Sequence, residues 1–121
     1  MLKQHESILN AIEVVQSFAN EKKLKVDIRD ADNSNGPHVS LRDAADKAVI
    51  SFRVRQTLGL SFAGLKHKIE LSEAVMFEYT GYGTFDVGTR RGKAKLTGLL
   101  DKKLAEHRSA VQMTRALNLR P

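Results

Sequence analysis

The chain has 121 residues and a mass of 13.5 kDa, with 20 Lys and Arg against 14 Asp and Glu, a formal net charge of +6 and a pI near 9.8. Apolar residues make up 41% and charged residues 28%, a composition typical of a folded protein rather than of a disordered or fibrous one. The chain has no cysteine, which excludes a disulfide scaffold, a thiol nucleophile and a Cys-ligated metal centre.

The length and the hydropathy pattern predict a single domain that comprises residues 1–121 and does not contact a membrane. No apolar run approaches the ~18–20 residues of a membrane span. The first residues lack the basic and then apolar order of a secretory signal. We therefore expect a cytoplasmic protein with no membrane partner.

The positive charge is concentrated at the C-terminal end of the chain. Residues 88–121 hold nine Lys and Arg against two Asp and Glu, a net charge of +7, whereas residues 1–87 hold eleven against twelve, a net charge of −1. A near-neutral scaffold joined to a basic segment is typical of proteins that bind a polyanion, most often a nucleic acid. The alternative is a helix face kept basic for solubility.

The N-terminal part of the chain predicts a helix and then a strand. Ile8, Val15 and Phe18 recur at helical spacing, which predicts an amphipathic helix over residues 3–20. Residues 22–30 switch to a period of two and predict a half-buried strand. Residues 30–37 are rich in Asp, Asn, Gly and Pro, which favours a loop.

Apolar residues alternate through much of the middle of the chain. Residues 39–41 begin a second strand, and residues 42–56 fit either a helix or a strand, with β-branched residues favouring a strand from about Ala48 onward. Residues 65–71 and 75–79 predict two paired strands that turn at residues 71–73. A glycine-punctuated turn and short strand follow at residues 81–88.

A second helical pattern begins at about Thr89 or Gly92 and runs to Leu117. The whole order predicts an α+β protein: an N-terminal helix, an antiparallel β-meander of four to five strands, and a basic C-terminal helix packed on the sheet.

Motifs for enzymatic chemistry are incomplete in this sequence. Residues 81–83 lack the third glycine of a dinucleotide-binding turn, because Asp86 stands in its place, and residues 88–93 are one residue too short for a phosphate-binding loop. The four histidines are scattered singly, without metal-ligand spacing. We therefore expect no cofactor, no metal, no catalytic residue and no enzymatic activity.

The densest cluster of cations coincides with the predicted start of the last helix. Arg90, Arg91, Lys93 and Lys95 stand where the positive end of the helix dipole disfavours cations, by ~0.3–1 kcal/mol for each well-placed charge. Free N–H groups together with Arg and Lys side chains form a phosphate site. The alternative is a helix that begins near Thr97, with the cations in a solvated loop.

Three further residues extend this predicted phosphate site. Lys102 and Arg108 continue the cationic track, although they do not share one helix face. Five of the seven aromatic residues lie in residues 62–85, just before the basic run. Among them Tyr82 either stacks on an unpaired base, for ~1–3 kcal/mol, or is a packed turn residue.

Two local resemblances also favour nucleic-acid binding. Residues 81–90, which read Gly-Tyr-Gly-Thr-Phe-Asp-Val-Gly-Thr-Arg, resemble the turn that leads into the DNA-binding arms of the bacterial HU/IHF nucleoid proteins. A helical segment replaces the arm that follows there. The order of helix, meander and basic helix resembles double-stranded-RNA-binding domains, but with an extra hairpin. The chain is assigned to neither family.

From these observations we predict a non-enzymatic accessory protein that binds the DNA or RNA backbone with little sequence specificity. The alternative is a protein-docking module that contacts an acidic protein surface or further copies of itself. Such a module is a small inhibitor of a nucleic-acid-processing machine, or a structural subunit of an assembly such as a virion.

Overall fold

The computed structural model describes residues 6–29, 36–61, 64–75 and 78–118. These residues form two helices and five strands, which confirms the predicted α+β class. In chain order the elements are α1 (Glu6–Lys22), β1 (Lys25–Arg29), β2 (His38–Arg42), β3 (Ala48–Ser61), β4 (Gly64–Val75), β5 (Glu78–Phe85) and α2 (Arg90–Asn118).

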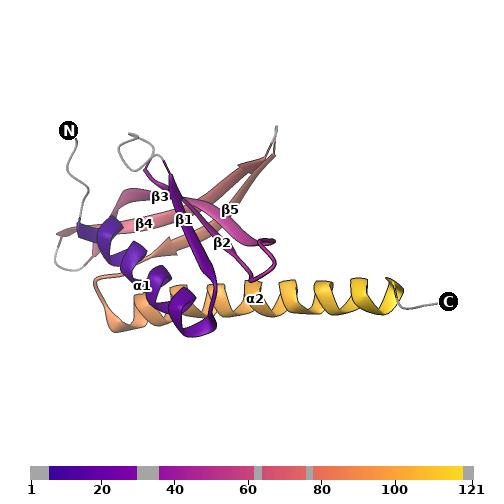
Figure 1. Cartoon of the computed structure of the whole chain (residues 1–121). Helices are drawn as coiled ribbons and strands as arrows, with labels where there is room; N and C mark the ends of the chain where they lie inside the picture. Colours follow the sequence, from indigo (N-terminus) through magenta and orange to yellow (C-terminus); the bar gives the residue numbers. More distant parts are fainter. Residues whose placement is uncertain (1–5, 30–35, 62–63, 76–77, 119–121) are drawn as a thin grey trace.

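The strands form one antiparallel meander in the order β1-β2-β3-β4-β5. Both helices lie on the same face of this sheet, and α2 continues past it toward the C-terminus (Figure 1). The last turns of α2 are correspondingly open to solvent, since residues 112–117 are all exposed. The basic C-terminal helix therefore packs on the sheet with its first half and projects with its second.

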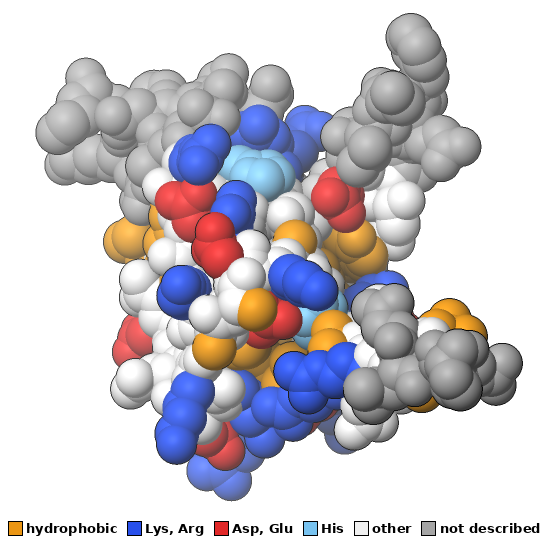
Figure 2. Space-filling model, turned by 45° about the vertical axis from the view of Figure 1, so that its right-hand side comes forward, with side chains coloured by type: hydrophobic (Ala, Val, Ile, Leu, Met, Phe, Trp, Pro, Cys, Tyr) orange, Lys and Arg blue, Asp and Glu red, His pale blue; other side chains and the backbone are white. Residues whose placement is uncertain are grey.

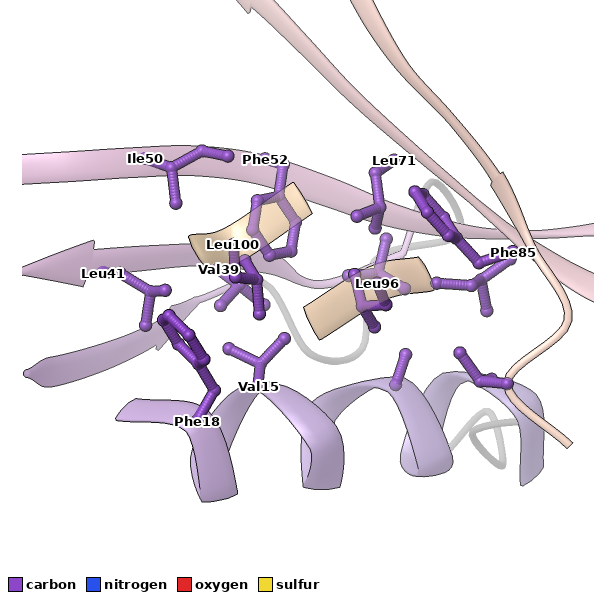
Figure 3. Close-up of a cluster of buried hydrophobic side chains, with 14 of the residues drawn as sticks. Val15, Phe18, Val39, Leu41, Ile50, Phe52, Leu71, Phe85, Leu96 and Leu100 are labelled. Atoms are coloured by element: carbon purple, nitrogen blue, oxygen red, sulfur yellow. The ribbon is translucent and has the colours of Figure 1, made fainter. Parts of the chain in front are cut away.

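The core fills the space between the sheet and the two helices. Val15 and Phe18 of α1 point toward the sheet, and Leu96 and Leu100 of α2 enter the same cluster (Figure 3). Helical residues four apart and alternate strand residues share one face, so both periodicities predicted from sequence place their apolar side chains in this core. The strands supply buried cross-strand pairs, namely Leu41 with Ile50, Val39 with Phe52, Val54 with Leu71, and Ile69 with Phe85.

The first helix ends at a residue in the left-handed region. Lys23 has a φ of 59°. The N–H of Leu24 donates to the carbonyl of Ala19 at 2.8 Å, and the N–H of Lys23 donates to that of Asn20 at 3.4 Å. This is the Schellman pattern of helix ends, in which glycine is the usual residue. The helix predicted over residues 3–20 is confirmed from Glu6 and extends to Lys22.

The ambiguous segment 42–56 contains a turn and then a strand. Both the Ala45 and Lys47 N–H groups donate to the carboxylate of Asp43 at 2.9 Å, and Asp46 has a φ of 64°. A side chain that accepts hydrogen bonds from backbone N–H groups two to four residues ahead favours a turn over a helix. The chain then enters β3 at Ala48, as the β-branched residues predicted.

The turn predicted at residues 71–73 is wrong. β4 runs without a break from Gly64 to Val75, and the register shifts between Leu71 and Ser72, which pair with Gly83 and Gly81. Tyr82 is thus an extra residue in β5, a β-bulge, and Gly83 beside it has a φ of 119°. Ser72 and Glu73 look like turn residues in sequence, but they belong to the strand that faces this bulge.

The remaining predictions concern α2 and two other segments. The helix expected from Thr89 or Gly92 to Leu117 is confirmed as α2, so the alternative start near Thr97 does not occur. Residues 30–35 of the predicted loop lie outside the described residues, as do Phe62 and Phe77 of the aromatic cluster.

Candidate nucleic-acid interface

The start of α2 is fixed by a network around Thr89, which is the N-cap residue. Its hydroxyl oxygen accepts the N–H of Gly92 at 3.0 Å and donates to the carbonyl of Asp86 at 2.9 Å. The N–H of Lys93 donates to the Thr89 carbonyl at 3.0 Å, which is the first helical bond. A Cβ on Gly92 would overlap the Asp86 backbone, so only glycine fits at this position. The helix therefore begins at Arg90 for local and specific reasons.

The four cations of the predicted site stand in the first two turns of this helix. Arg90, Arg91, Lys93 and Lys95 are all exposed, and α2 has no acidic residue in its first turn. None of the four has an ion pair with another residue that the structure describes, and the Lys95 ammonium lies 5.5 Å from the ring centroid of Phe85. Asp86 precedes the helix, and its carboxylate accepts the N–H of Gly88 at 3.2 Å. The positive end of the helix dipole and these side chains therefore add to one positive field.

The structure divides the predicted residues of α2 between two sides of the helix. At about 100° per residue, Arg91, Lys95 and Lys102 fall within a stripe about 40° wide, here called the α2 stripe. On the same geometry, Arg90 and Arg108 lie about 100–140° away from that stripe, and Lys93 lies about 160° away from it. All three residues of the α2 stripe are exposed, so this side of the helix presents three cations to solvent.

Tyr82 occupies a packed position between β5 and α2. Its hydroxyl donates to the Glu73 carboxylate at 2.7 Å, and the ammonium of Lys103 lies 5.5 Å from its ring centroid. Partial burial, reinforced by Glu73, raises the pKa of Tyr82 to about 12. These contacts make Tyr82 part of the joint between sheet and helix, and base stacking by its ring stays a prediction.

Arg108 faces a groove that the sequence did not predict. This groove lies between the end of α1, the β2–β3 turn and the second half of α2, with a volume of about 380 Å³. Lys22, Lys23 and Arg115 line it together with Arg108. Figure 2 shows Lys and Arg side chains gathered around apolar ones along the lower part of that face, over α2. Lys22 and Lys23 are not part of the site predicted from the sequence, because these residues approach Arg108 and Arg115 only in the folded chain.

The face of the sheet opposite the helices carries further cations. Arg29 pairs with His38 across β1 and β2, and His38 pairs with Arg53 across β2 and β3, so these side chains form one row. The guanidinium of Arg53 donates to the carbonyl of Gly36 at 2.7 Å. Arg29 is paired on the same face with Asp27, whose carboxylate lies 2.8 Å from the guanidinium, so part of this positive charge is neutralised locally.

The described residues contain no cluster of three or more His, Asp or Glu side chains able to hold a metal ion. Neither helix is long and apolar enough, within its described residues, to cross a membrane. Comparisons of the chain with models of protein families, with curated proteins and with solved structures give no match.

Proposed function

We propose that this protein is a non-enzymatic accessory protein that binds DNA or RNA through the phosphate backbone, with little sequence specificity. The observation that carries the proposal is the charge of α2. This helix holds eight Lys and Arg against two Asp and Glu, a net charge of +6 that equals the net charge of the whole chain. Both acidic residues of α2 have cationic neighbours, since Asp101 lies 3.9 Å from Lys22 and Glu106 lies 3.4 Å from Lys103.

The α2 stripe is the main contact surface in this proposal. Arg91 and Lys102 are eleven residues apart, which is ~16 Å along the helix axis. Duplex DNA carries one phosphate per ~3.4 Å of axis on each strand, so the stripe spans several phosphates. Arg90 and, from the opposite side of the helix, Lys93 add positive charge at the capped helix start. Lys and Arg that bind phosphates position a nucleic acid without reading its bases, which accounts for low specificity.

The salt dependence of binding tests this proposal. Fluorescence anisotropy with labelled duplex DNA, duplex RNA and single strands measures the Kd across a series of salt concentrations. The log–log slope grows by about 0.9 for each phosphate contacted on B-DNA. The variant with Arg90→Ala, Arg91→Ala, Lys93→Ala and Lys95→Ala should therefore lower the slope by about 3–4 units on duplex DNA.

A matched control removes the same charge from the rest of the molecule. It carries Lys25→Ala, Lys47→Ala, Arg55→Ala and Lys68→Ala, and its slope should change by less than about one unit. Circular dichroism verifies that both variants are folded. An unchanged slope in the α2 variant, or no binding of the wild type at about 50 mM salt, contradicts the proposal. A larger loss in the control would instead assign the contact to the sheet face.

A second candidate function is docking onto an acidic protein surface, as an inhibitor of a nucleic-acid-processing machine or a subunit of a larger assembly. Apolar surface on the projecting part of α2 favours it. Met113 is 67% exposed and Leu117 is 59% exposed, four residues apart on one side of the helix. Exposed apolar side chains beside cations fit a protein partner better than a phosphate backbone.

A further inference from the structure

The groove beside α2 has an apolar floor. Leu24, Leu104 and Val111 line it from three places in the chain, and its volume of about 380 Å³ lies within the usual range of ligand sites. Leu104 is buried, whereas Leu24 and Val111 are only partly covered by the described residues. The floor therefore offers a place for an apolar group from outside the molecule.

Cations surround this floor. Lys22 and Lys23 stand on one side and Arg108 and Arg115 on the other, with Asp43 as the carboxylate among the lining residues. Asp43 is already engaged, because its carboxylate contacts His107 at 2.8 Å and accepts the N–H groups of the β2–β3 turn. Lys23, Arg108 and Arg115 have no ion pair with any residue of the described part of the chain. The groove thus presents a net positive rim around an apolar centre.

Lys23 gives an independent indication that this rim has a function. It occupies the left-handed position of the Schellman pattern at the end of α1, where glycine is the usual residue. A side chain with a Cβ at this conformation destabilises the fold by ~1 kcal/mol relative to glycine. Strained positions of this kind cluster at functional sites, which makes Lys23 a candidate.

We propose that this groove binds an acidic peptide segment of a partner protein, with one or two large apolar side chains seated between Leu24, Leu104 and Val111. Carboxylates on the flanks of the segment then lie near Lys23, Arg108 and Arg115. An apolar centre with a polar, complementary rim is the usual arrangement of a protein interface. A phosphate backbone has no aliphatic side chain for the floor, so the site differs in chemistry from the α2 stripe.

The experiment uses two short synthetic peptides that carry fluorescein. One has Glu and Leu in amphipathic helical order, and the other has every Leu replaced by Ser. Anisotropy should show binding of the Leu peptide and at least tenfold weaker binding of the Ser peptide. Amide shifts in a two-dimensional NMR spectrum should be concentrated at Leu24, Val111 and Gln112, which line the groove.

The groove variant Lys23→Gly with Arg115→Ala separates binding from folding. Glycine suits the backbone at position 23, so this variant should melt no lower than the wild type while it binds the Leu peptide about fivefold to tenfold more weakly. The control variant Arg91→Ala with Lys102→Ala loses the same charge from the α2 stripe, and its peptide affinity should stay within about twofold.

Three results would overturn the proposal. They are equal affinity for the Leu and Ser peptides, equal affinity of the groove variant and the wild type, and amide shifts away from the groove. If the groove variant instead loses affinity for duplex DNA and keeps its affinity for the peptide, the groove belongs to a nucleic-acid interface. Failure of DNA binding in the wild type does not affect this test, since the groove and the α2 stripe share no residue.

Discussion

The hydroxyl of Tyr82 and the carboxylate of Glu73 form a close contact that joins β5 to β4. The bulge at Tyr82 directs the side chain toward Glu73, with which it has a hydrogen bond of 2.7 Å, and Lys103 of α2 approaches the ring. Partial burial of a phenol favours its neutral form, and a neighbouring carboxylate favours it further. One bulged residue thus connects two strands and the helix that carries the proposed site.

Tyr82 should therefore titrate later than an ordinary tyrosine. The chain has two tyrosines, so Tyr79→Phe leaves Tyr82 as the one phenol to follow by ultraviolet absorbance. Its midpoint is expected at about 12 rather than about 10. Because the folded pKa is raised, the stabilisation is complete below pH ~10 and is lost as the pH rises toward 12. Glu73→Gln should lower the midpoint, and an ordinary midpoint in the Tyr79→Phe variant would contradict the packing described for Tyr82.

The two glycines of α2 have opposite roles. Gly92 lies against the Asp86 backbone at the helix start, whereas a Cβ on Gly98 would meet nothing within 4 Å. Glycine in the interior of a helix is disfavoured by conformational entropy unless a close approach requires it. Such an approach occurs at Gly92 but not at Gly98.

Alanine at these two positions should change stability in opposite directions. Gly98→Ala should raise the free energy of unfolding by about 0.5–1 kcal/mol, because the helix gains propensity without a clash. Gly92→Ala should lower it by about 1–3 kcal/mol, because the new Cβ displaces the capped helix start. Urea unfolding followed by circular dichroism measures both. Stabilisation by Gly92→Ala would show that the α2 start is not as described.

The pair of Asp43 and His107 joins residues that are 64 positions apart in sequence. It ties the β2–β3 turn to the middle of α2, next to the proposed peptide groove. The hydrogen bond from His107, followed by that from the Lys47 N–H, holds the pKa of Asp43 below its ordinary value. One carboxylate therefore connects the β2–β3 turn to α2 beside the groove.

Acid should weaken this connection. Since the folded pKa of Asp43 is lowered, its contribution to stability is present above the unfolded value of about 4 and is lost as the pH falls through the folded value. Asp43→Asn should be less stable than the wild type at pH 7, and the difference should shrink below pH ~4. Urea unfolding at both pH values measures this, and a difference that does not depend on pH would contradict it.

The sequence predicts most of the fold because the decisive patterns are local. The alternation in β3 and the four-residue spacing of Leu96, Leu100 and Leu104 require no knowledge of a partner. The prediction of a turn at residues 71–73 is wrong because the polar residues there face β5. A bulge in β5 shifts the strand pairing at this point, and Tyr82 forms a hydrogen bond with Glu73. Such a contact between two strands cannot be predicted from the sequence of either strand alone.

The candidate site likewise has one part that the sequence predicts and one part that it does not. The density of cations at residues 90–95 and the spacing of Lys102 and Arg108 are visible in the sequence. The groove is not visible, because Lys22 and Lys23 meet Arg108 and Arg115 only through the packing of α1 against α2. Charge totals over long segments hide such groupings, as the near-neutral sum over residues 1–87 does.

The edge position of β1 has a consequence for how copies of this protein behave when they collide. An exposed strand edge is a template for aggregation, because its N–H and C=O groups can pair with another chain. Two β1 strands that paired antiparallel about Asp27 would bring Asp27 opposite Asp27 and Lys25 opposite Arg29. Every one of these cross-strand pairs joins like charges, which are repulsive when directly opposed. The short charged strand therefore protects the open edge of the sheet against fibrous self-association.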